Sequence, residues 1–316
     1  MQALAGVGDN VFSPAVSRRG RRLAYTKVLD DWNIWRLKIP AAEKRHPPTK
    51  LIYSTQAEDG PQYSPDGKRI AFASNRSGSY EIWVCDTEGK KPVPVTSIGG
   101  PSTGSPCWSP DGQRIAFDSL EAGKSDIYVV PADGGPTKCL TGNYKAGAML
   151  PSWSRDGEWI YFASEEQVWK LPIRGGDPVQ VTRDGGWLPR ASPDGKFIYY
   201  MHWMAPRLSI RRVPVQGGEE AEVVPPLKGA AWNGWTLGEQ GIYFIDFEAS
   251  PRAAIKFFSF RTREISQIGE MEKERRRLRH EFAPAGRITV SPDEKWLLYV
   301  QYDQSGSDIM LVENFR

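Results

Sequence analysis

The sequence predicts an all-β protein, a seven-bladed β-propeller with four antiparallel strands in each blade. The first observation is a repeated phrase, Ser-Pro-Asp-Gly, which is followed two residues later by an apolar strand. The second is the spacing of these phrases, since repeats of about 45 residues are typical of propeller blades. The third is that every repeat holds several short strands separated by glycine-rich turns, with no stretch of helical periodicity.

The phrase is intact in three copies and altered in three others. A seventh, eroded copy is placed by counting six residues back from Ile242, which begins the strand Ile-Tyr-Phe. The seven copies begin at Ser17, Ser64, Ser109, Ser154, Ser192, Thr236 and Ser291.

The second repeat illustrates how each unit is expected to fold. Strands are predicted over residues 61–64, 69–73, 81–84 and 93–96. The first turn suits its residues, because Pro65 sets φ for the first central position and Gly67 accepts a positive φ. The other repeats follow the same order. Their second strands are predicted at residues 115–117, 160–162, 198–200, 242–244 and 297–299, third strands at 33–35, 126–129 and 308–311, and fourth-strand ends at 140–141, 181–182 and 223–224.

The two ends of the chain predict how the propeller closes. After residues 308–313 the chain stops at Arg316, so the last blade has three strands of its own. Residues 2–6 resemble the fourth-strand ending at residues 138–142. We therefore expect the N-terminal strand to join the C-terminal blade, which closes the ring and covers an exposed sheet edge.

Composition favours a single domain over residues 1–316, without a separate linker or second domain. The chain has 40% hydrophobic residues and a net charge of +3, which is too small to suggest nucleic-acid binding. No apolar run is long enough to cross a membrane, and the first eight residues do not resemble a signal peptide. We expect a monomer in the cytoplasm, or in the periplasm if the chain is cut from a longer one.

The sequence predicts no metal site, no cofactor and no catalytic site. The three cysteines, Cys85, Cys107 and Cys139, lack metal-ligand spacing and are expected to be buried hydrophobes. Residues 100–104 match Gly-x-Ser-x-Gly, but they lie in a loop between blades rather than at a strand-to-helix turn. The basic run at residues 273–280 is interrupted by glutamates and is expected to be a solvated loop tip.

A candidate binding face is formed by the loops that enter the first strands and those that join second to third strands. Large aromatic side chains interspersed with arginines are typical of recognition surfaces. The candidates are Trp32, Tyr144, Trp187, Arg190, His202, Trp203, Arg207, Trp232 and Trp235, with Met149 and Met204 nearby. By contrast, Tyr63, Trp108 and Trp153 recur in register one residue before the turn serine and are expected in the core.

The segment from Ser64 to Gly78, Ser-Pro-Asp-Gly-Lys-Arg-Ile-Ala-Phe-Ala-Ser-Asn-Arg-Ser-Gly, resembles the WD-repeat-like propeller repeat of the TolB family. The resemblance extends over the whole chain. TolB itself has six blades and a separate N-terminal domain, so its partners in the cell envelope are not carried over.

The C-terminal segment, residues 303–316, is similar to the end of the propeller half of bacterial winged-helix transcriptional regulators. That resemblance implies a sensing or interaction module. In those proteins DNA binding belongs to the winged helix, so no direct contact with nucleic acid is expected from this propeller.

Three functions follow from these observations. The preferred one is a non-catalytic module that binds a protein, a peptide or a small ligand at the loop-rich face. The second is the gating propeller of a prolyl-oligopeptidase-like or tricorn-like peptidase, of which this chain would be a fragment. The third is an enzyme similar to oligogalacturonate lyase, which is disfavoured because His46 and His202 are expected on opposite faces.

Overall fold

The chain folds into strands. The computed structural model describes residues 11–17, 22–39, 46–100, 102–121, 123–204, 207–227, 230–249, 251–274 and 287–313. These ranges contain 25 strands and no helix, so the predicted all-β class is confirmed. It follows that these ranges hold no helix of the kind that crosses a membrane.

Five sheets each consist of four consecutive antiparallel strands, and we number them II to VI in chain order. Sheet II holds β4 (Glu58–Tyr63), β5 (Arg69–Ser74), β6 (Glu81–Asp86) and β7 (Val93–Pro94). Sheet III holds β8 (Ser102–Trp108), β9 (Arg114–Glu121), β10 (Lys124–Pro131) and β11 (Lys138–Cys139). Sheet IV holds β12 (Met149–Trp153), β13 (Trp159–Ser164), β14 (Gln167–Pro172) and β15 (Val179–Gln180). Sheet V holds β16 (Trp187–Ala191), β17 (Phe197–Met204), β18 (Arg207–Pro214) and β19 (Ala221–Leu227). Sheet VI holds β20 (Ala230–Leu237), β21 (Gly241–Asp246), β22 (Arg252–Ser259) and β23 (Ile265–Glu274).

Sheet I is built from both ends of the chain. Its path runs β24 (Ile288–Val290), β25 (Trp296–Val312), β2 (Leu23–Lys38) and β3 (Thr49–Ile52), and β1 (Val11–Val16) pairs with the outer part of β2. The ladder between β2 and β25 runs from Leu23 opposite Val312 to Lys38 opposite Trp296. First and last segments of the sequence therefore share one sheet.

The predicted number of seven blades is wrong, because the described residues form six sheets. The second and third strands expected in the first repeat are one continuous strand, β2, and those of the last repeat are one continuous strand, β25. In the first repeat the expected connection is Asp30-Asp31-Trp32, which contains neither glycine nor proline to favour a turn. In the last repeat, the dipeptide Ser305-Gly306 would suit a turn. Hydrogen bonding to β2 nevertheless keeps β25 extended through these two residues.

The closure prediction is corrected in its detail. Residues 1–7, which were expected to supply an outer strand, lie outside the described residues. The N-terminal strand that joins the C-terminal hairpin is instead β2, which lies in the interior of sheet I between β25 and β3. The six sheets do not form one continuous hydrogen-bonded ring, since each is a separate ladder.

Side chains make the junctions between sheets. Strand β4 contacts β8, β8 contacts β12, β12 contacts β16, β16 contacts β20, β20 contacts β24, and β24 contacts β4. A cluster of buried apolar side chains lies at each of these six junctions. Tyr63, Trp108 and Trp153 are buried, as predicted. Burial on both faces explains why the strands read as nearly continuous apolar runs.

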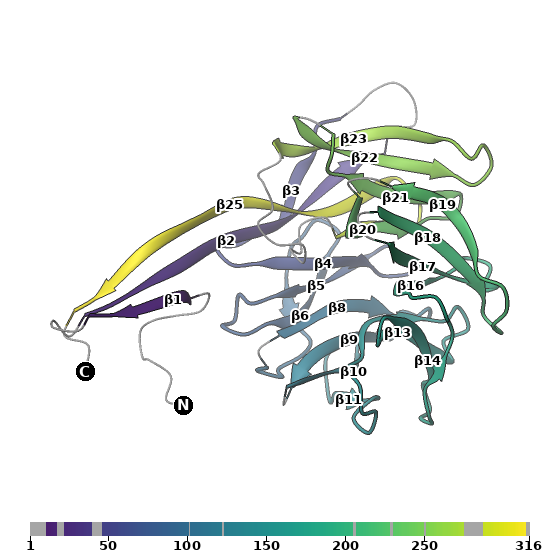
Figure 1. Ribbon diagram of the computed structural model, residues 1–316, viewed down its shortest axis with the longest axis horizontal. Coiled ribbons are helices and arrows are strands. Elements are labelled where there is room, and N and C mark those ends of the chain that lie inside the picture. The colour runs from purple at the N-terminus through teal and green to yellow at the C-terminus, as the bar shows by residue number, and fades with distance from the viewer. Residues whose placement is uncertain are drawn as a thin grey trace.

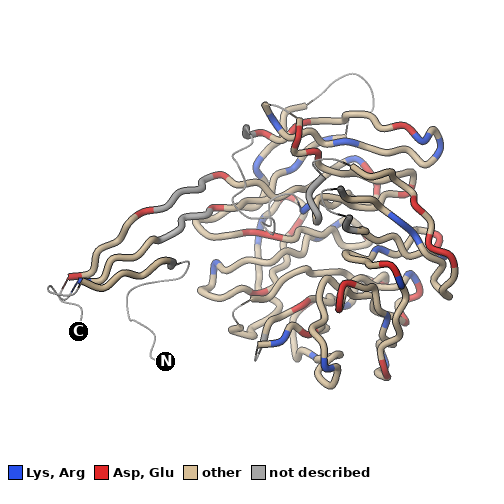
Figure 2. Tube along the Cα trace, viewed as in Figure 1, with Lys and Arg blue, Asp and Glu red and all other residues tan. Residues whose placement is uncertain are grey.

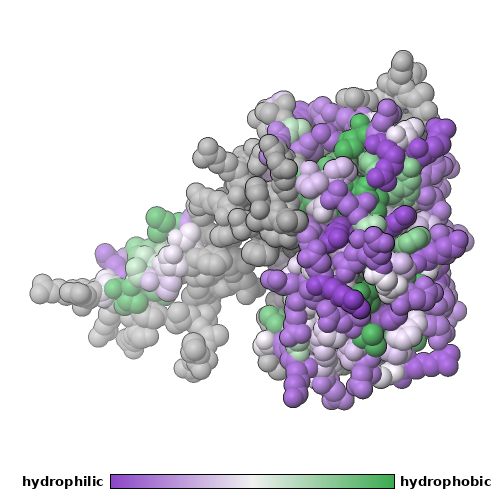
Figure 3. All heavy atoms as spheres, turned by 45° about the vertical axis from the view of Figure 1, so that its right-hand side comes forward, coloured by the Kyte–Doolittle hydropathy of each residue, from purple (hydrophilic) through white to green (hydrophobic). Residues whose placement is uncertain are grey.

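An arm extends away from the sheets (Figure 1). It consists of β1, residues 23–31 of β2 and residues 304–312 of β25. Figure 3 shows apolar residues on the surface of the arm. Ile309 is 82% exposed and Leu311 is 56% exposed. On the body of the molecule, acidic and basic residues are interspersed rather than segregated, in keeping with the small net charge (Figure 2).

The recurring phrase forms a tight turn held by its own side chains. In the first intact copy, the Ser64 hydroxyl donates to Asp66 Oδ1 at 2.6 Å and accepts from the Arg69 amide at 2.9 Å. The same pair of bonds recurs in the copies that begin at Ser109, Ser154, Ser192 and Ser291. Gly67 has a φ of 69°, which explains the glycine at the end of the phrase. The phrase therefore sets the entry into every second strand that follows it.

These turns make an acid-dependent contribution to stability. The bond from the turn serine holds the pKa of Asp66, Asp111, Asp156, Asp194 and Asp293 below the usual value for aspartate. A carboxyl whose folded-state pKa is depressed stabilises the fold above its unfolded pKa of about 3.9, and this contribution is lost as the pH falls through the folded pKa.

We expect the Asp111→Asn, Asp156→Asn double variant to lie closer in stability to wild type at pH 3 than at pH 6. Urea unfolding at both pH values measures this difference. Burial raises the pKa of three other carboxyls, those of Glu58, Asp59 and Asp118, so their contribution to stability changes with pH in the opposite direction. Because wild type and the double variant both contain these carboxyls, their contribution cancels in the difference between the two proteins. Asp177→Asn, an exposed position outside the turns, is the control. An equal deficit of the double variant at both pH values would contradict this account.

Candidate binding site in the central channel

A cavity of about 650 Å³ lies where the first strands of all six sheets face one another. We call it the channel. Its lining comes from β4, β8, β12, β16, β20 and β24, together with the residues that follow them into the turns. Because every sheet contributes its innermost strand, the cavity is on the common axis of the six sheets.

A bulge in four of these strands shapes the channel wall. The ladder to the second strand shifts register after Asp59, Gly104, Met149 and Trp187. At each bulge a residue with positive φ precedes a proline, and these residues are Gly60, Ser105, Leu150 and Leu188. A bulge changes which way the following side chains point. Since the device is repeated in four sheets, it belongs to the architecture of the wall.

The position two residues before the turn serine faces the channel in sheet after sheet. It is occupied by Gln62, Cys107, Ser152, Arg190 and Thr289 in sheets II, III, IV, V and I. In sheet VI the same position is Thr236, because Leu237 pairs with Ile242 there as Tyr63 pairs with Ile70 in sheet II. Arg190 is thus the single charged residue among six equivalent positions.

Arg190 forms no hydrogen bond or ion pair with any described residue. Burial lowers the pKa of its guanidinium, and the positive charge of Arg287 acts in the same direction. Arg190 is half-buried, so its guanidinium gives up part of its hydration without gaining a counter-charge, which is unfavourable. The channel therefore holds a positive charge that the described protein groups do not neutralise.

Arg287, by contrast, is partnered. Its Nε lies 3.4 Å from Asp59 Oδ2, and its Nη1 donates to Ser105 Oγ at 3.2 Å. Burial raises the pKa of Asp59, while Arg287 and the Gly60 amide oppose that rise. The three residues come from sheets I, II and III, so this ion pair links the sheet built from the two chain ends to its neighbours.

Asp118 is also engaged. It accepts from the Leu150 amide at 2.7 Å, and burial raises the pKa of its carboxyl. The hydrogen bond from Leu150 and the charge of Arg287 oppose this rise. Asp118 therefore joins sheet III to sheet IV.

Asn233 is the second group in the channel without a partner. It lies in the irregular part of β20, is 3% exposed, and lines the channel beside sheet V. Among the described residues, neither its carboxamide nitrogen nor its oxygen has a hydrogen-bond partner. Burying both an unused donor and an unused acceptor costs free energy, so such groups call for an explanation.

The residues predicted for the loop-rich face are dispersed. Among the candidates whose side chains the structure describes, only Arg190 lines the channel. Trp235 is 1% exposed in the apolar cluster that links sheets V and VI, and Trp187 packs against that cluster. Tyr144 packs against Phe162 and Trp169, with ring centroids 5.9 and 5.8 Å away.

Two further candidates have defined neighbours. Trp32 stacks edge-to-face on Tyr302 near the base of the arm, with ring centroids 5.2 Å apart. His202 is 8% exposed, and its Nε2 lies 3.7 Å from Asp184 Oδ2, which also pairs with Arg211 at 2.8 Å. The side chains of Trp203, Met204, Arg207 and Trp232 lie outside what the structure describes. That the remaining residues form one binding face stays a prediction.

Other sequence expectations have mixed outcomes. Cys85 and Cys107 are buried as expected, and burial raises the pKa of Cys85 to about 12. The expectation that Cys139 is buried is wrong, because it lies exposed in β11, a two-residue outer strand. Most of the basic run, residues 275–280, lies outside the described residues. In the ranges that are described, no three histidine, cysteine or acidic side chains converge as a metal site would require.

The sequence pointed to Arg190 but for the wrong reason, and it missed Asn233 and Arg287. Arg190 was selected as part of an aromatic loop face, whereas its place is in the channel wall. Aligning the repeats on the turn serine would have shown that Arg190 is the odd residue at its position. No comparable alignment would have found Asn233, because its repeat lacks the intact phrase.

Comparison with known proteins gives a consistent family. The family model described as PD40, TolB beta propeller domain, matches residues 2–135 and 94–225. The uncharacterized protein Atu1656 of Agrobacterium fabrum is 31% identical over 78 residues. That match covers 24% of this chain and 25% of the relative, so it spans about a quarter of the curated protein.

Solved structures show the same fold at low identity. The putative TolB from Agrobacterium tumefaciens superposes with a TM-score of 0.66 at 20% identity, over 87% of this chain and 99% of that one. TolB from Acinetobacter baumannii gives 0.61 at 19% identity, over 77% of this chain and 65% of that one.

A puromycin-hydrolyzing peptidase of Mycobacterium tuberculosis gives a TM-score of 0.55 at 14% identity, over 85% of this chain and 47% of that one. This similarity shows the propeller fold alone. The six sheets around one channel, the recurring turn phrase and the family match agree, and the chain belongs to the TolB beta propeller domain family.

Proposed function

We propose that this chain is a non-catalytic binding module that receives a small ligand or the end of a partner chain in its channel. The observation that carries the proposal is the channel itself, into which all six sheets direct side chains. Its wall mixes polar groups such as Gln62, Ser152 and Thr289 with the aromatic edges of Trp108 and Trp153. Concave sites of a few hundred Å³ with a small number of placed polar groups are typical ligand sites.

The channel also has energetic reasons to be occupied. Arg190 is half-buried and Asn233 is buried there, and neither side chain has a partner among the described residues. A ligand that satisfied them would recover free energy that the empty protein does not. The aromatic candidates Trp32, Tyr144 and Trp235 also each bury a polar atom without a hydrogen-bond partner among the described residues, but none of these three residues lines the channel.

The module would act as a sensor or scaffold, and we place it in a bacterial regulator. This part rests on the similarity of residues 303–316 to the ends of winged-helix regulators with propeller halves. In such an arrangement the occupancy of the channel would be transmitted to a neighbouring effector domain or partner. A fold hosts many functions, so this assignment depends on finding the ligand and the partner.

A gating propeller of a peptidase is the second candidate. It is favoured by the similarity to the puromycin-hydrolyzing peptidase, of which the matched region covers about half. The two candidates differ in a simple assay. A binding module leaves peptide p-nitroanilides intact, whereas a complete peptidase of which this chain is a part would hydrolyse them.

The proposal is tested by filling the channel. Ser152→Trp places a large ring at a wall position, and Ser77→Trp makes the same change on an exposed turn as the control. A fluorine-labelled fragment library is screened by NMR against wild type and both variants. We expect fragments that bind wild type to bind Ser77→Trp equally well and Ser152→Trp at least about tenfold more weakly.

Near-ultraviolet circular dichroism establishes that Ser152→Trp is folded. If it is not, Thr289→Trp blocks the channel from sheet I instead. Fragments that bind a folded, blocked variant as tightly as wild type would place binding elsewhere and refute the proposal.

A further inference from the structure

The channel has a chemical preference that goes beyond the presence of a binding site. Resting on the function proposed above, we infer that the channel binds an oxyanion, a carboxylate or a phosphate, between Arg190 of sheet V and Asn233 of sheet VI. The ligand would be a small acid or the acidic end of a chain. The neighbouring sheets V and VI would supply its principal contacts.

The first argument is the position of Arg190. Five equivalent positions in the other sheets are uncharged, namely Gln62, Cys107, Ser152, Thr236 and Thr289. A neutral side chain is therefore sufficient to pack at this position of the channel wall, and an arginine is not required for packing. A guanidinium presents several donors in one plane, which matches the oxygens of carboxylate and phosphate.

The second argument is that the nearby carboxylates are committed elsewhere. Asp59 pairs with Arg287, and Asp118 accepts from the Leu150 amide. Glu294, at the edge of the channel, accepts from the Tyr243 hydroxyl at 3.0 Å and from the Glu239 amide. None of these groups forms an ion pair with Arg190, so an anion from outside is the natural counter-charge.

The third argument is the carboxamide of Asn233. Its nitrogen can donate to one oxygen of an anion, and its oxygen can accept from a hydroxyl or amino group beside that anion. Both atoms are buried and unpaired among the described residues. A single ligand with an acidic group next to a donor, such as a hydroxy acid, would satisfy both at once.

The same observations exclude a simple cationic ligand at this place. A second positive charge beside Arg190 and Arg287 would meet repulsion in a poorly solvated cavity. The negative charges of Asp59 and Asp118 lie close to Arg287 and offset its positive charge, not that of Arg190. The pairing of Arg190 with Asn233 therefore selects an anion.

The experiment measures thermal stabilisation of the whole chain by three probes at constant ionic strength. The probes are inorganic phosphate, succinate and L-lactate, with sodium chloride as the reference. Phosphate and the two carboxylates distinguish the sources of the anion, and lactate carries a hydroxyl beside its acid. We expect at least one probe to raise the melting temperature of wild type in a saturable manner.

Arg190→Gln is the diagnostic variant, because glutamine already stands at the equivalent position in sheet II. We expect it to weaken binding of the active probe by roughly tenfold or more, since a charged hydrogen bond is lost. Without a probe it should melt at the same temperature as wild type or higher, because an unpaired, half-buried cation is removed. Arg183→Gln removes an exposed arginine that does not line the channel and should leave binding intact.

Asn233→Asp provides an independent test if Arg190→Gln does not fold. It places a negative charge in the channel wall of the neighbouring sheet, which would repel an anion and offset the charge of Arg190, so it should abolish the response to the probes. Failure of all three probes to stabilise wild type, or stabilisation that persists in both variants, would overturn the inference. So would a lower melting temperature of Arg190→Gln without a probe.

The two proposals fail differently. If neutral fragments bind wild type and are blocked by Ser152→Trp, but no anion binds, the channel is a binding site without the anion preference. If an anion binds Ser152→Trp as well as wild type, both proposals fail together.

Discussion

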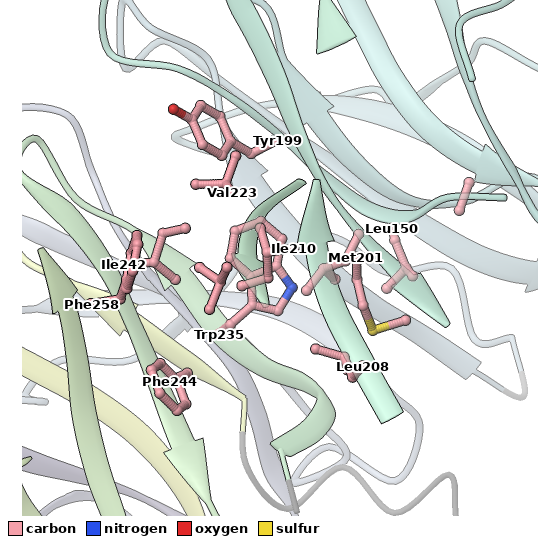
Figure 4. Close-up of a cluster of buried hydrophobic side chains, with 13 residues drawn as sticks. Leu150, Tyr199, Met201, Leu208, Ile210, Val223, Trp235, Ile242, Phe244 and Phe258 are labelled. Atoms are coloured by element: carbon pink, nitrogen blue, oxygen red, sulfur yellow. The ribbon is translucent and has the colours of Figure 1, made fainter. Parts of the chain in front are cut away.

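Replacing Trp235 by alanine is expected to lower the free energy of unfolding by about 3–5 kcal/mol. Trp235 is 1% exposed and lies among Ile210, Ile242, Phe244 and Phe258 at the junction of sheets V and VI (Figure 4). Removing the ring leaves a cavity between two sheets. Because each sheet is rigid, the neighbouring side chains cannot easily move in to fill that cavity. Urea unfolding followed by circular dichroism measures the loss.

Two further variants make this result specific. Trp235→Phe keeps most of the volume and removes an indole N–H that has no hydrogen-bond partner among the described residues. It should therefore cost much less than alanine. Trp159→Ala removes a half-buried ring at the start of β13, and it should also cost less than Trp235→Ala.

The alternative is that Trp235 belongs to a binding face, as the sequence suggested. In that case Trp235→Ala would leave stability within about 1 kcal/mol of wild type and reduce ligand binding. The burial of the ring makes the opposite pattern the expected one.

A disulfide between Thr26→Cys and Ile309→Cys is expected to form spontaneously and to stabilise the protein by up to about 5 kcal/mol. These residues are directly opposite in the ladder between β2 and β25. Opposed residues of an antiparallel pair have Cα atoms about 4.5–5.5 Å apart, which suits a disulfide. The bond would close a loop of nearly the whole chain, and long loops lose the most entropy in the unfolded state.

The measurement is made in a Cys139→Ser background, because Cys139 is an exposed native thiol. The cross-linked chain runs differently on a non-reducing gel and melts at a higher temperature than after reduction. Thr26→Cys with Leu311→Cys is the control, since Leu311 is opposite Ala24, two residues out of register.

This experiment distinguishes six sheets from seven. In a seven-sheet propeller, Thr26 would belong to the second strand of the first sheet and Ile309 to the third strand of the last. They would then be in different sheets, and the bond would not form. Equal cross-linking of the matched and mismatched pairs would also refute the ladder described here.

Much of the fold could be predicted from particular residues. Ser64, Asp66 and Gly67 determine a turn through bonds between near neighbours, so the same phrase forms the same turn wherever it occurs. Alternation of such turns with short apolar runs then predicts all-β sheets. The family resemblance drawn from residues 64–78 is confirmed by the match to the TolB beta propeller domain.

The candidate site was much less predictable. The positions of Arg190 and Asn233 depend on the bulge in β16 and on the irregular pairing of β20, which are in different sheets. Arg287 meets Asp59 across a separation of more than two hundred residues. Tryptophan was a poor guide, because the junctions between sheets use the same large rings that recognition surfaces use. Trp235 packs inside one junction cluster, and Tyr144 packs against Trp169 at another junction.

The sequence by itself determined the strand class, the turns and the family, because these follow from hydrogen bonds and apolar patterns within a single repeat. Only the tertiary structure decided that the first and last repeats share sheet I, since that depends on pairing between chain ends. It likewise decided which side chains face the channel and which of them stay unpaired. A local pattern specifies local geometry, whereas the number of sheets and the pairing of charges depend on all six sheets being in place.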